Sequence, residues 1–365
     1  MTTIEQLGWT PHFEHQRNPE MDGDLIPARV AEEQRGSYRI LTEHGLRYAE
    51  LSGRYRHRAG AGETELPCAG DWVMARVPAT SAGPEASAGD PSLIHRLLER
   101  HTAFTRRAAG TRSVPQVVAA NVDTLFLVQS LNRDLNLRRL ERYLALLWES
   151  GAEPVLVLSK ADLCEEPAPL VDAAREAAIG VSVLVVSART PGGLDPLTPY
   201  LAPGRTAALV GSSGVGKSTI VNELVGEDVM QVREIREDDR GRHTTTARHL
   251  VMLPSGGMLL DTPGMRTVLL WEGQEGLDQT FEDITALAAR CRFRDCGHGS
   301  EPGCAVREAL DSGSLEPARW QSYTKLLREA RHEARKANHR LRMEEQRRWK
   351  RIAVANRNRP DKRKF

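Results

Sequence analysis

Two hydrophobic patterns follow one another along the chain. In residues 25–98, short runs of alternating apolar and polar residues are separated by turn residues, which predicts short β-strands. In residues 121–260, continuous apolar runs alternate with stretches such as Leu137, Leu140 and Leu144, whose spacing is helical. Continuous apolar runs are typical of strands buried on both faces of a parallel sheet, so this region is predicted to be α/β.

The alternating region contains five candidate strands and a turn signal at Gly70-Asp71. Five short strands suit a small barrel of the oligonucleotide-binding (OB) type. Arginines such as Arg39, Arg47 and Arg54 would give this barrel positive charge. The pattern leaves two readings open, a barrel that binds RNA and a barrel that only packs against its neighbour. The candidate strands are residues 26–30, 38–41, 47–51, 72–77 and 93–97.

The most specific motif is a glycine-rich stretch between an apolar run, residues 206–210, and a helical pattern that begins at Lys217. Strand, glycine loop and helix form the context in which G-x-x-x-x-G-K-S binds phosphates. Backbone N–H groups face the α- and β-phosphates, Lys217 reaches the β- and γ-phosphates, and Ser218 can hold Mg²⁺. The predicted phosphate-binding residues are Gly211, Ser212, Ser213, Gly214, Val215, Gly216, Lys217, Ser218 and Thr219.

Two turns that follow earlier apolar runs have the residues needed to read guanine. The carboxylate of Asp162 can accept hydrogen bonds from N1–H and the 2-amino group, a pair of donors that adenine lacks. Lys160 would lie along the base, and the turn at Ser187 would offer a backbone donor to O6. The predicted guanine-binding residues are Ser159, Lys160, Ala161, Asp162, Ser187 and Ala188.

Two further loops are predicted to sense the γ-phosphate. Asp261 begins an Asp-Thr-Pro-Gly turn, in which the aspartate can join the Mg²⁺ shell and a glycine N–H can bond the γ-phosphate. A threonine of the stretch 241–246, Gly-Arg-His-Thr-Thr-Thr, would cap Mg²⁺. The predicted catalytic residues are His243, Thr244, Thr245, Asp261, Gly264 and Lys217.

Met265 follows this turn, where many GTPases carry a glutamine that positions water. Methionine cannot orient water, so intrinsic hydrolysis should be slow unless another residue takes this role. His243 is the candidate, and an idle loop histidine is the alternative.

The motifs come in an unusual order, because the guanine-reading turns precede the phosphate loop. A parallel sheet brings the carboxyl ends of its strands together whatever their order in sequence, so the loops can still meet. The segment after Gly264 leads directly to the C-terminal module, and we expect loss of the γ-phosphate to move that module.

Three cysteines and one histidine follow in the pattern C-x₄-C-x-H-x₅-C, namely Cys291, Cys296, His298 and Cys304. Three thiolates and one imidazole make a closed tetrahedral Zn²⁺ site of the structural kind. Five cysteines in a chain without an export signal favour a metal over disulfides, and a cluster of reduced thiols is the alternative.

Composition and charge indicate the class of protein and the kind of partner. With 365 residues, 40% hydrophobic and 27% charged, the chain should form several globular domains. Residues 319–365 contain 17 Lys and Arg against 5 Asp and Glu, whereas residues 1–318 contain 33 against 44. A basic tail on an acidic body indicates a polyanionic partner. Without a signal-peptide pattern or an apolar run of membrane-spanning length, we expect a cytoplasmic location.

The expected domains follow from these signals. Residues 1–24 have few apolar residues beyond Leu7, Trp9 and Phe13, and we expect them to form a loosely held extension. The Ser-, Ala-, Gly- and Pro-rich residues 79–91 predict a flexible loop. The expected domains are the extension (1–24), the barrel with an arginine-rich linker at 96–112 (25–111), the nucleotide domain (112–270) and the zinc module with its basic helical tail (271–365).

Together these motifs resemble the RsgA family of circularly permuted GTPases, which assist late assembly of the small ribosomal subunit in bacteria. The most specific matches are residues 211–219, 241–246, 261–264 and 291–306. The resemblance implies a multidomain α/β protein with an N-terminal five-stranded OB-type barrel, a circularly permuted P-loop GTPase domain with a mostly parallel sheet, and a C-terminal helical zinc-binding module.

The resemblance also implies a function. Members hydrolyse GTP slowly alone and faster on the small (30S) subunit, and they bind ribosomal RNA through the barrel and the zinc module. A histidine in the switch loop is thought to serve hydrolysis, which matches His243. Ser159 replaces the Asn or Thr usual at its position, and its shorter side chain would reach fewer loop contacts.

We therefore expect a monomeric GTPase that binds GTP or GDP, Mg²⁺ and one structural Zn²⁺, and that acts on the small ribosomal subunit and its rRNA without membrane or DNA. One alternative is an rRNA-binding scaffold that holds nucleotide without significant turnover. A second is a small-molecule kinase on the same phosphate loop, which the guanine-reading turn and Asp261 argue against.

Overall fold

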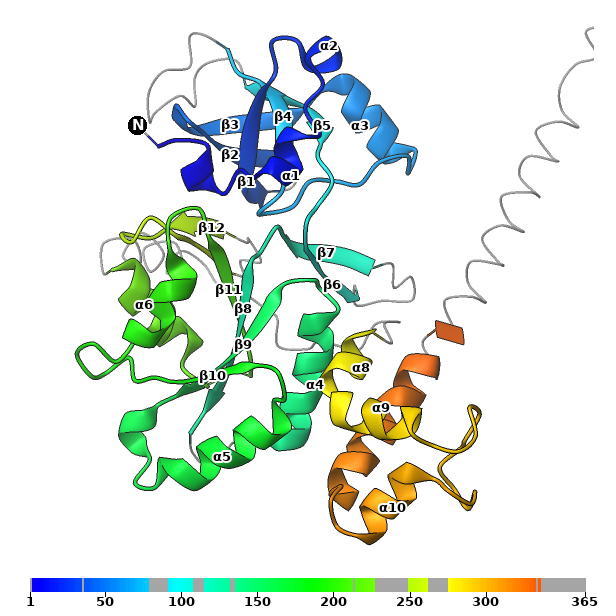
Figure 1. The fold of residues 1–365 in the computed structure, drawn as a ribbon. Coiled ribbons are helices and arrows are strands. Elements are labelled where there is room, and N and C mark those ends of the chain that lie inside the picture. Colours follow the sequence, from blue (N-terminus) through cyan, green and yellow to red (C-terminus); the bar gives the residue numbers. More distant parts are fainter. Residues whose placement is uncertain are drawn as a thin grey trace, which may run out of the picture. The chain divides into compact units, whose positions relative to one another are not determined.

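The chain divides into two compact units, residues 1–269 and 270–365. The computed structural model (Figure 1) describes residues 2–34, 36–78, 91–107, 115–131, 135–212, 214–226, 249–261, 275–332 and 334–335. In the first unit a single 11-stranded sheet runs through a barrel and a nucleotide-type fold, in the order β10-β9-β8-β11-β13-β12-β1-β2-β3-β5-β4.

The barrel forms from the five strands that the alternating pattern predicted. β1 pairs with both β2 and β4, and β5 joins β3 to β4, so the strands close on themselves. Residues at alternate positions, among them Val30, Ile40 and Ile94, are fully buried inside it. The elements are β1 (Ile26–Gln34), β2 (Ser37–Thr42), β3 (Gly45–Leu51), α3 (Gly53–Gly60), β4 (Trp72–Arg76) and β5 (Ser92–Leu97). Of the predicted flexible loop, residues 79–90 lie outside the described residues.

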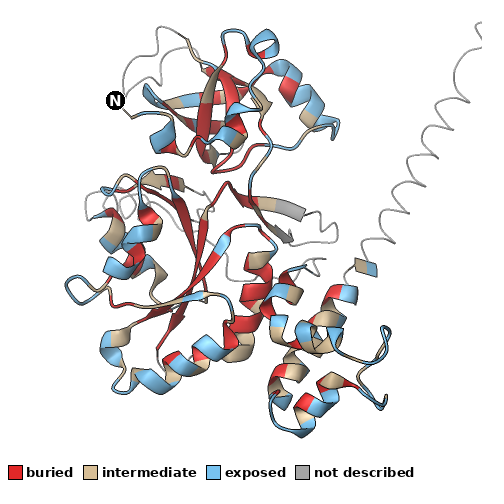
Figure 2. Ribbon diagram, viewed as in Figure 1, coloured by how far each residue is buried: buried red, intermediate tan, exposed pale blue. Residues whose placement is uncertain are grey.

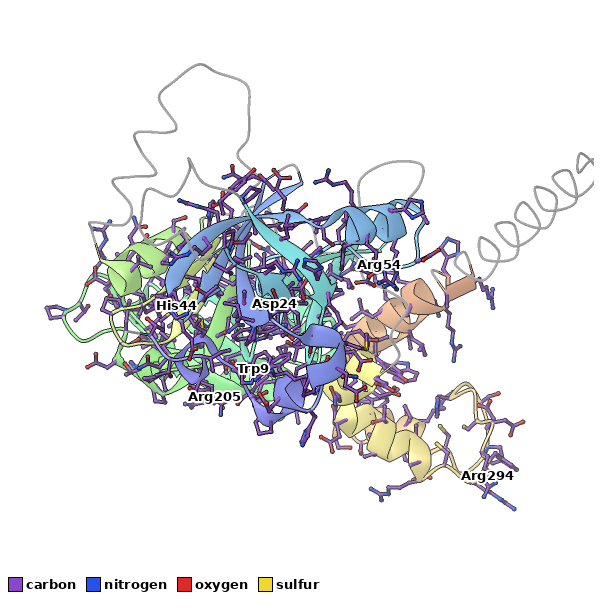
Figure 3. The ribbon with its side chains drawn as sticks, turned by 90° about the horizontal axis from the view of Figure 1, so that it is seen from above. Trp9, Asp24, His44, Arg54, Arg205 and Arg294 are labelled. Carbon is purple, nitrogen blue, oxygen red and sulfur yellow. The ribbon has the colours of Figure 1, made fainter. Side chains whose placement is uncertain are left out.

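The N-terminal segment is not the loosely held extension that its polar composition suggested. It forms η1 (Glu5–Leu7), α1 (Pro11–Glu14) and α2 (Pro19–Asp22), and Leu7, Trp9 and Phe13 are buried. Successive side chains of β4 point to opposite faces, with Val73 in the barrel core and Trp72 on the other side. This second side is apolar, so another segment must bury it. Trp9, which is labelled in Figure 3, covers this side. Its ring lies 4.8 Å from that of Trp72 in an edge-on arrangement. The prediction failed because three well-spaced apolar residues suffice to dock a short segment.

The predicted arginine-rich linker contributes residues to two strands. Arg96 belongs to β5 and lies 2.7 Å from the buried carboxylate of Asp22. Beyond it, β6 (Ala103–Arg107) pairs with β7 (Pro115–Ala120) in a separate two-stranded sheet. Composition alone misses this pairing because it depends on contacts between segments that flank residues 108–114.

The nucleotide-type fold contains six strands, which lie in the region of continuous apolar runs. β8, β9, β10, β11 and β13 are parallel, and β12 is antiparallel, which confirms the mostly parallel sheet. Figure 2 shows the central strands buried, and separate core clusters lie on the two faces. The elements are β8 (Thr124–Ser130), α4 (Leu137–Trp148), β9 (Glu153–Ser159), η2 (Ala161–Leu163), α5 (Pro167–Ala177), β10 (Ser182–Val185), η3 (Asp195–Leu201), β11 (Thr206–Val210), α6 (Lys217–Val225), β12 (His249–Met252) and β13 (Met258–Asp261).

A buried arginine fastens the joint between barrel and nucleotide fold. Arg29 donates hydrogen bonds to the carbonyl oxygens of Leu7 (2.5 Å), Asn121 (2.8 Å) and Gly70 (3.3 Å). Burial lowers its pKa to about 10, so the guanidinium remains charged at neutral pH. These carbonyls belong to the N-terminal segment, the entry to β8 and the barrel, so one side chain ties three parts of the unit together.

The second unit is helical in its described part. It contains α8 (Glu275–Thr280), α9 (Glu282–Ala289), α10 (Ala305–Asp311) and a helix over residues 317–332. Arg319 joins the last helix to α9 through Asp283, at 2.7 Å, and its guanidinium lies 4.9 Å from the ring centre of Phe281. Across the described residues, none of the helices combines the length and the apolar character that a membrane crossing needs.

Candidate nucleotide and metal sites

The glycine-rich stretch forms a tight loop between β11 and α6, as the motif requires. Gly211 has φ +150°, and a Cβ atom there would lie 2.4 Å from the carbonyl oxygen of Val128, so only glycine fits. Lys217 folds back over the loop and donates to the carbonyl oxygens of Gly211 (2.7 Å) and Ser212 (2.6 Å). Ser218 is exposed in the first turn of α6, at the end where backbone N–H groups are free to bind an anion.

The predicted guanine-reading turn touches this phosphate loop. The Ser159 hydroxyl lies 2.6 Å from the carbonyl oxygen of Val215 and 3.2 Å from that of Gln129, and its single proton favours the shorter contact. Lys160 donates from Nζ to the carbonyl oxygen of Gly214 at 2.6 Å. The serine therefore still ties the turn to the loop, although it is shorter than the side chains usual there.

The second of the two turns predicted to read guanine orients the carboxylate of the first. Ser187 donates from Oγ to Oδ1 of Asp162 at 2.6 Å and accepts from the Thr190 hydroxyl at 3.0 Å. Asp162 itself is exposed, as a group that meets a ligand must be. Within the described part of the chain, the Ala188 amide has no hydrogen-bond acceptor, which leaves it available for a base.

The structure describes only some of the remaining predicted nucleotide residues. Asp261 ends β13, and its backbone pairs with that of His249 on β12. The other predicted positions, Ser213, His243, Thr244, Thr245 and Gly264, lie outside the described residues.

The sequence motifs do not include one residue that lies beside the phosphate loop. Arg139 donates from Nη1 to the Ser212 hydroxyl at 3.0 Å, from the first turn of α4. A cation in the first turn opposes the helix dipole, so its position favours a role towards an anion rather than in helix stability. The sequence signal was available, because Arg139 lies three residues after the N-cap Asn136, in the helix that follows β8, the strand beside β11.

The four predicted metal ligands come together in the second unit. One ligand atom from each of Cys291, Cys296, His298 and Cys304 lies within 4.8 Å of the others. The sulfur atoms of Cys291 and Cys304 are 3.9 Å apart, and they lie 3.6 and 3.5 Å from Nδ1 of His298. Tetrahedral Zn²⁺ with Zn–S distances of about 2.3 Å places two sulfurs about 3.8 Å apart. The donor set therefore fits a zinc ion. Its role would be structural, because protein ligands would occupy all four coordination positions.

A second layer of contacts holds this cluster in shape. The Glu301 carboxylate accepts hydrogen bonds from the backbone of Gly297 (2.9 Å) and Gly299 (2.7 Å), on either side of His298. Hydrogen bonds from its own N–H and from these glycines lower the pKa of Glu301. The Trp320 ring packs edge-on against the imidazole with centroids 5.6 Å apart, so the ligand is oriented from two sides.

The strand order, the phosphate loop and the turn that touches it define a class, the circularly permuted GTPase fold, here joined to a five-stranded barrel and a Cys₃His module. Residues 97–271 match the family model described as RsgA GTPase. The chain is 44% identical over 352 residues to the small ribosomal subunit biogenesis GTPase RsgA of Opitutus terrae, covering 96% of each chain. It is 45% identical to the protein of the same name from Streptomyces avermitilis, over 94% of this chain and 90% of that one. The chain belongs to the RsgA family.

Solved structures agree with this assignment. The crystal structure of YjeQ from Thermotoga maritima matches with a TM-score of 0.62 and 25% identity, over 84% of this chain and 98% of that chain. YloQ, described as a circularly permuted GTPase, matches in fold with a TM-score of 0.61 over 87% of this chain and 98% of that chain.

Proposed function

We propose that the protein hydrolyses GTP and acts as a late assembly factor of the small ribosomal subunit, which stimulates its turnover. The observation that carries the proposal is the direct contact between guanine-reading turn and phosphate loop, Ser159 to Val215 and Lys160 to Gly214. Loops that lie more than fifty residues apart in sequence thereby meet in one place.

The roles follow from the chemistry of each group. Lys217 moves from the loop carbonyls to the β- and γ-phosphates, Ser218 holds Mg²⁺, and Asp162 accepts from guanine. Arg139 adds positive charge beside the phosphates. The groups that act on the γ-phosphate and the attacking water are Asp261, Gly264, either Thr244 or Thr245, and His243. The Cys₃His cluster holds one Zn²⁺, whose role is to fix the fold of its module.

The partner is proposed from the names of the relatives and from charge. Two near-full-length relatives are named for biogenesis of the small subunit. A net excess of basic residues over 319–365 suits the phosphates of rRNA. A cytoplasmic monomer that contacts rRNA through the barrel and the zinc module accounts for these features.

Turnover with purified subunits tests the proposal. We expect phosphate release from GTP to be slow for the protein alone, faster with small subunits and unchanged with large subunits. Release that stays at the level of the protein alone would favour the scaffold without turnover, and equal binding of ATP and GTP would favour the kinase.

His243→Ala tests the predicted catalytic histidine. We expect subunit-stimulated turnover to fall by about a hundredfold, because general-base or water-positioning groups contribute about 10²–10⁴-fold. Affinity for a non-hydrolysable GTP analogue should remain unchanged. His44→Ala, at an exposed barrel histidine, is the control. Unchanged turnover in His243→Ala would show that this histidine is idle.

A further inference from the structure

A row of directly paired residues crosses the joint between the barrel and the nucleotide fold. His249 on β12 pairs with Asp261 on β13 and with Glu32 on β1, Glu32 pairs with Arg39 on β2, and Arg39 pairs with Tyr48 on β3. Side chains of directly paired residues in antiparallel strands lie next to one another on one face of the sheet. The row thus connects the outer face of the barrel with the strand that ends at the predicted Mg²⁺ aspartate.

Glu32 is the centre of this row. Its side chain is only 2% exposed, and its Oε2 lies 3.2 Å from Nδ1 of His249 and 3.8 Å from Nη1 of Arg39. Gln34 donates to its other oxygen. Burial raises the pKa of Glu32, but the hydrogen bonds from His249 and Gln34 and the electrostatic effect of the neighbouring His249 and Arg39 together bring it below the usual value. The carboxylate is therefore ionised at neutral pH and is shared between the barrel surface and β12.

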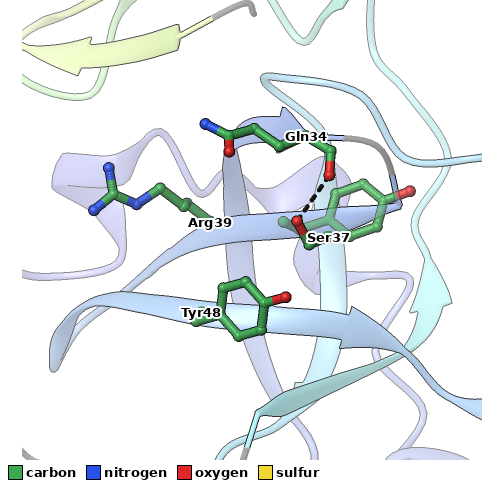
Figure 4. Close-up of a pocket in the computed structure, with 5 residues that line it drawn as sticks. Gln34, Ser37, Arg39 and Tyr48 are labelled. Atoms are coloured by element: carbon green, nitrogen blue, oxygen red, sulfur yellow. Dashed lines mark hydrogen bonds between the residues drawn. The ribbon is translucent and has the colours of Figure 1, made fainter. Parts of the chain in front are cut away.

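The barrel end of the row opens into a pocket of about 270 Å³ (Figure 4). The Arg39 side chain is 51% exposed and Tyr48 is 46% exposed, so a guanidinium and an aromatic face are both accessible. Polar groups complete the lining, and the Tyr38 hydroxyl is buried without a hydrogen-bond partner among the described residues. The lining residues are Gln34, Ser37, Tyr38, Arg39 and Tyr48.

We propose that this pocket binds one unpaired nucleotide of RNA, and that its occupancy is transmitted through Glu32 to His249 and the Mg²⁺ side of the GTP site. The proposal rests on the proposed function. A base stacks on Tyr48, a phosphate pairs with Arg39, and the Gln34 amide and Ser37 hydroxyl meet the base edge.

The transmission follows from the shared carboxylate. When Arg39 turns to a phosphate, Glu32 loses its contact with the guanidinium and keeps the contact with Nδ1 of His249 at 3.2 Å, so the carboxylate is held towards β12. His249 is the first residue of β12 and comes three residues after the Gly241–Thr246 stretch. Holding it in place restrains the backbone that pairs with Asp261. Glu32 and His249 are positioning residues, since neither is proposed to touch nucleotide.

Variants at the pocket test its occupant. Tyr48→Leu and Arg39→Gln should weaken binding of purified small subunits and of a short single-stranded RNA by about fivefold or more, and Tyr48→Phe should bind like the parent. Arg58→Gln on α3 removes the same charge outside the row and should stay within about twofold. Fluorescence anisotropy of labelled RNA and co-sedimentation with subunits measure these affinities.

A variant at the centre of the row tests the transmission. Glu32→Gln keeps the shape but removes the charge, so GDP affinity, subunit affinity and turnover without subunits should remain at the parent level. Subunit-stimulated turnover should fall by about tenfold, within the usual range of coupling between two sites. His249→Gln should give the same separation of stimulation from binding.

The outcomes decide between the parts of the proposal. Parent-like RNA binding by Tyr48→Leu would overturn the pocket, as would weakened subunit binding with unchanged RNA binding, which would indicate a ribosomal protein. Full stimulation of Glu32→Gln would overturn the transmission. If small subunits do not stimulate the parent protein, the proposed function and the transmission both fail. In that case, the affinities of the parent and the pocket variants for the short RNA alone test the pocket.

Discussion

Single hydroxyl groups organise the two turns that are proposed to read guanine. Ser159 reaches the carbonyl oxygen of Val215, and Ser187 holds the carboxylate of Asp162 in position, each at 2.6 Å. Both serines are buried, so each contact is made away from competing water. Removing either would leave a buried acceptor or an unrestrained carboxylate, and the cost would appear in nucleotide binding.

Ser159→Ala measures the first contact. We expect GDP and GTP to bind about tenfold more weakly, which corresponds to about 1.4 kcal/mol and to the usual contribution of one hydrogen bond. Titration with a fluorescent GDP analogue gives the affinity. Ser182→Ala, at an exposed serine of β10, is the matched control. Equal affinity of Ser159→Ala and the parent would mean that the turn is held by Lys160 and the backbone alone.

At the scale of elements, the N-terminal segment completes the barrel. β4 has apolar residues on both faces, because Val73 fills the barrel core while Trp72 and Met74 face the segment that carries Trp9 and Phe13. A strand that is apolar on both faces is stable only when both are covered. The segment and the barrel should therefore unfold together.

Trp9→Ala tests this packing. Truncation of a buried tryptophan should lower the free energy of unfolding by about 3 kcal/mol or more. Urea unfolding followed by the fluorescence of the remaining tryptophans measures the change. Met21→Ala, in the same segment but 71% exposed, should change stability by less than about 0.5 kcal/mol. A Trp9→Ala protein as stable as the Met21→Ala protein would restore the view of a loosely held extension.

At the scale of the whole molecule, the predicted nucleotide residues and the predicted metal ligands lie in different compact units. The described nucleotide residues belong to residues 1–269, and the Cys₃His cluster belongs to residues 270–365. The described helices of the second unit between 275 and 311 are each eight residues or shorter, so they offer little apolar core of their own. A small module of this kind depends on its metal for stability.

Zinc removal tests this dependence. Chelation, or Cys296→Ser, should release about one zinc per chain and lower the helical circular dichroism signal, while GDP affinity stays at the parent level. Cys164→Ser, at a half-buried cysteine outside the cluster, should retain zinc. Loss of GDP binding together with zinc would show that the two units are energetically linked.

The sequence by itself determined the strands of the barrel and of the nucleotide fold and the glycine-rich loop, and it predicted the guanine-reading turns and the metal ligands. These features depend on short-range rules, because apolar runs, glycine positions and ligand spacing act within a few residues. Only the tertiary structure decided that residues 2–24 dock on the barrel, that residues 103–107 form a strand and that Arg29 is buried at a joint. It also decided the row from Tyr48 to Asp261, since strand register joins residues more than two hundred positions apart and leaves no local pattern.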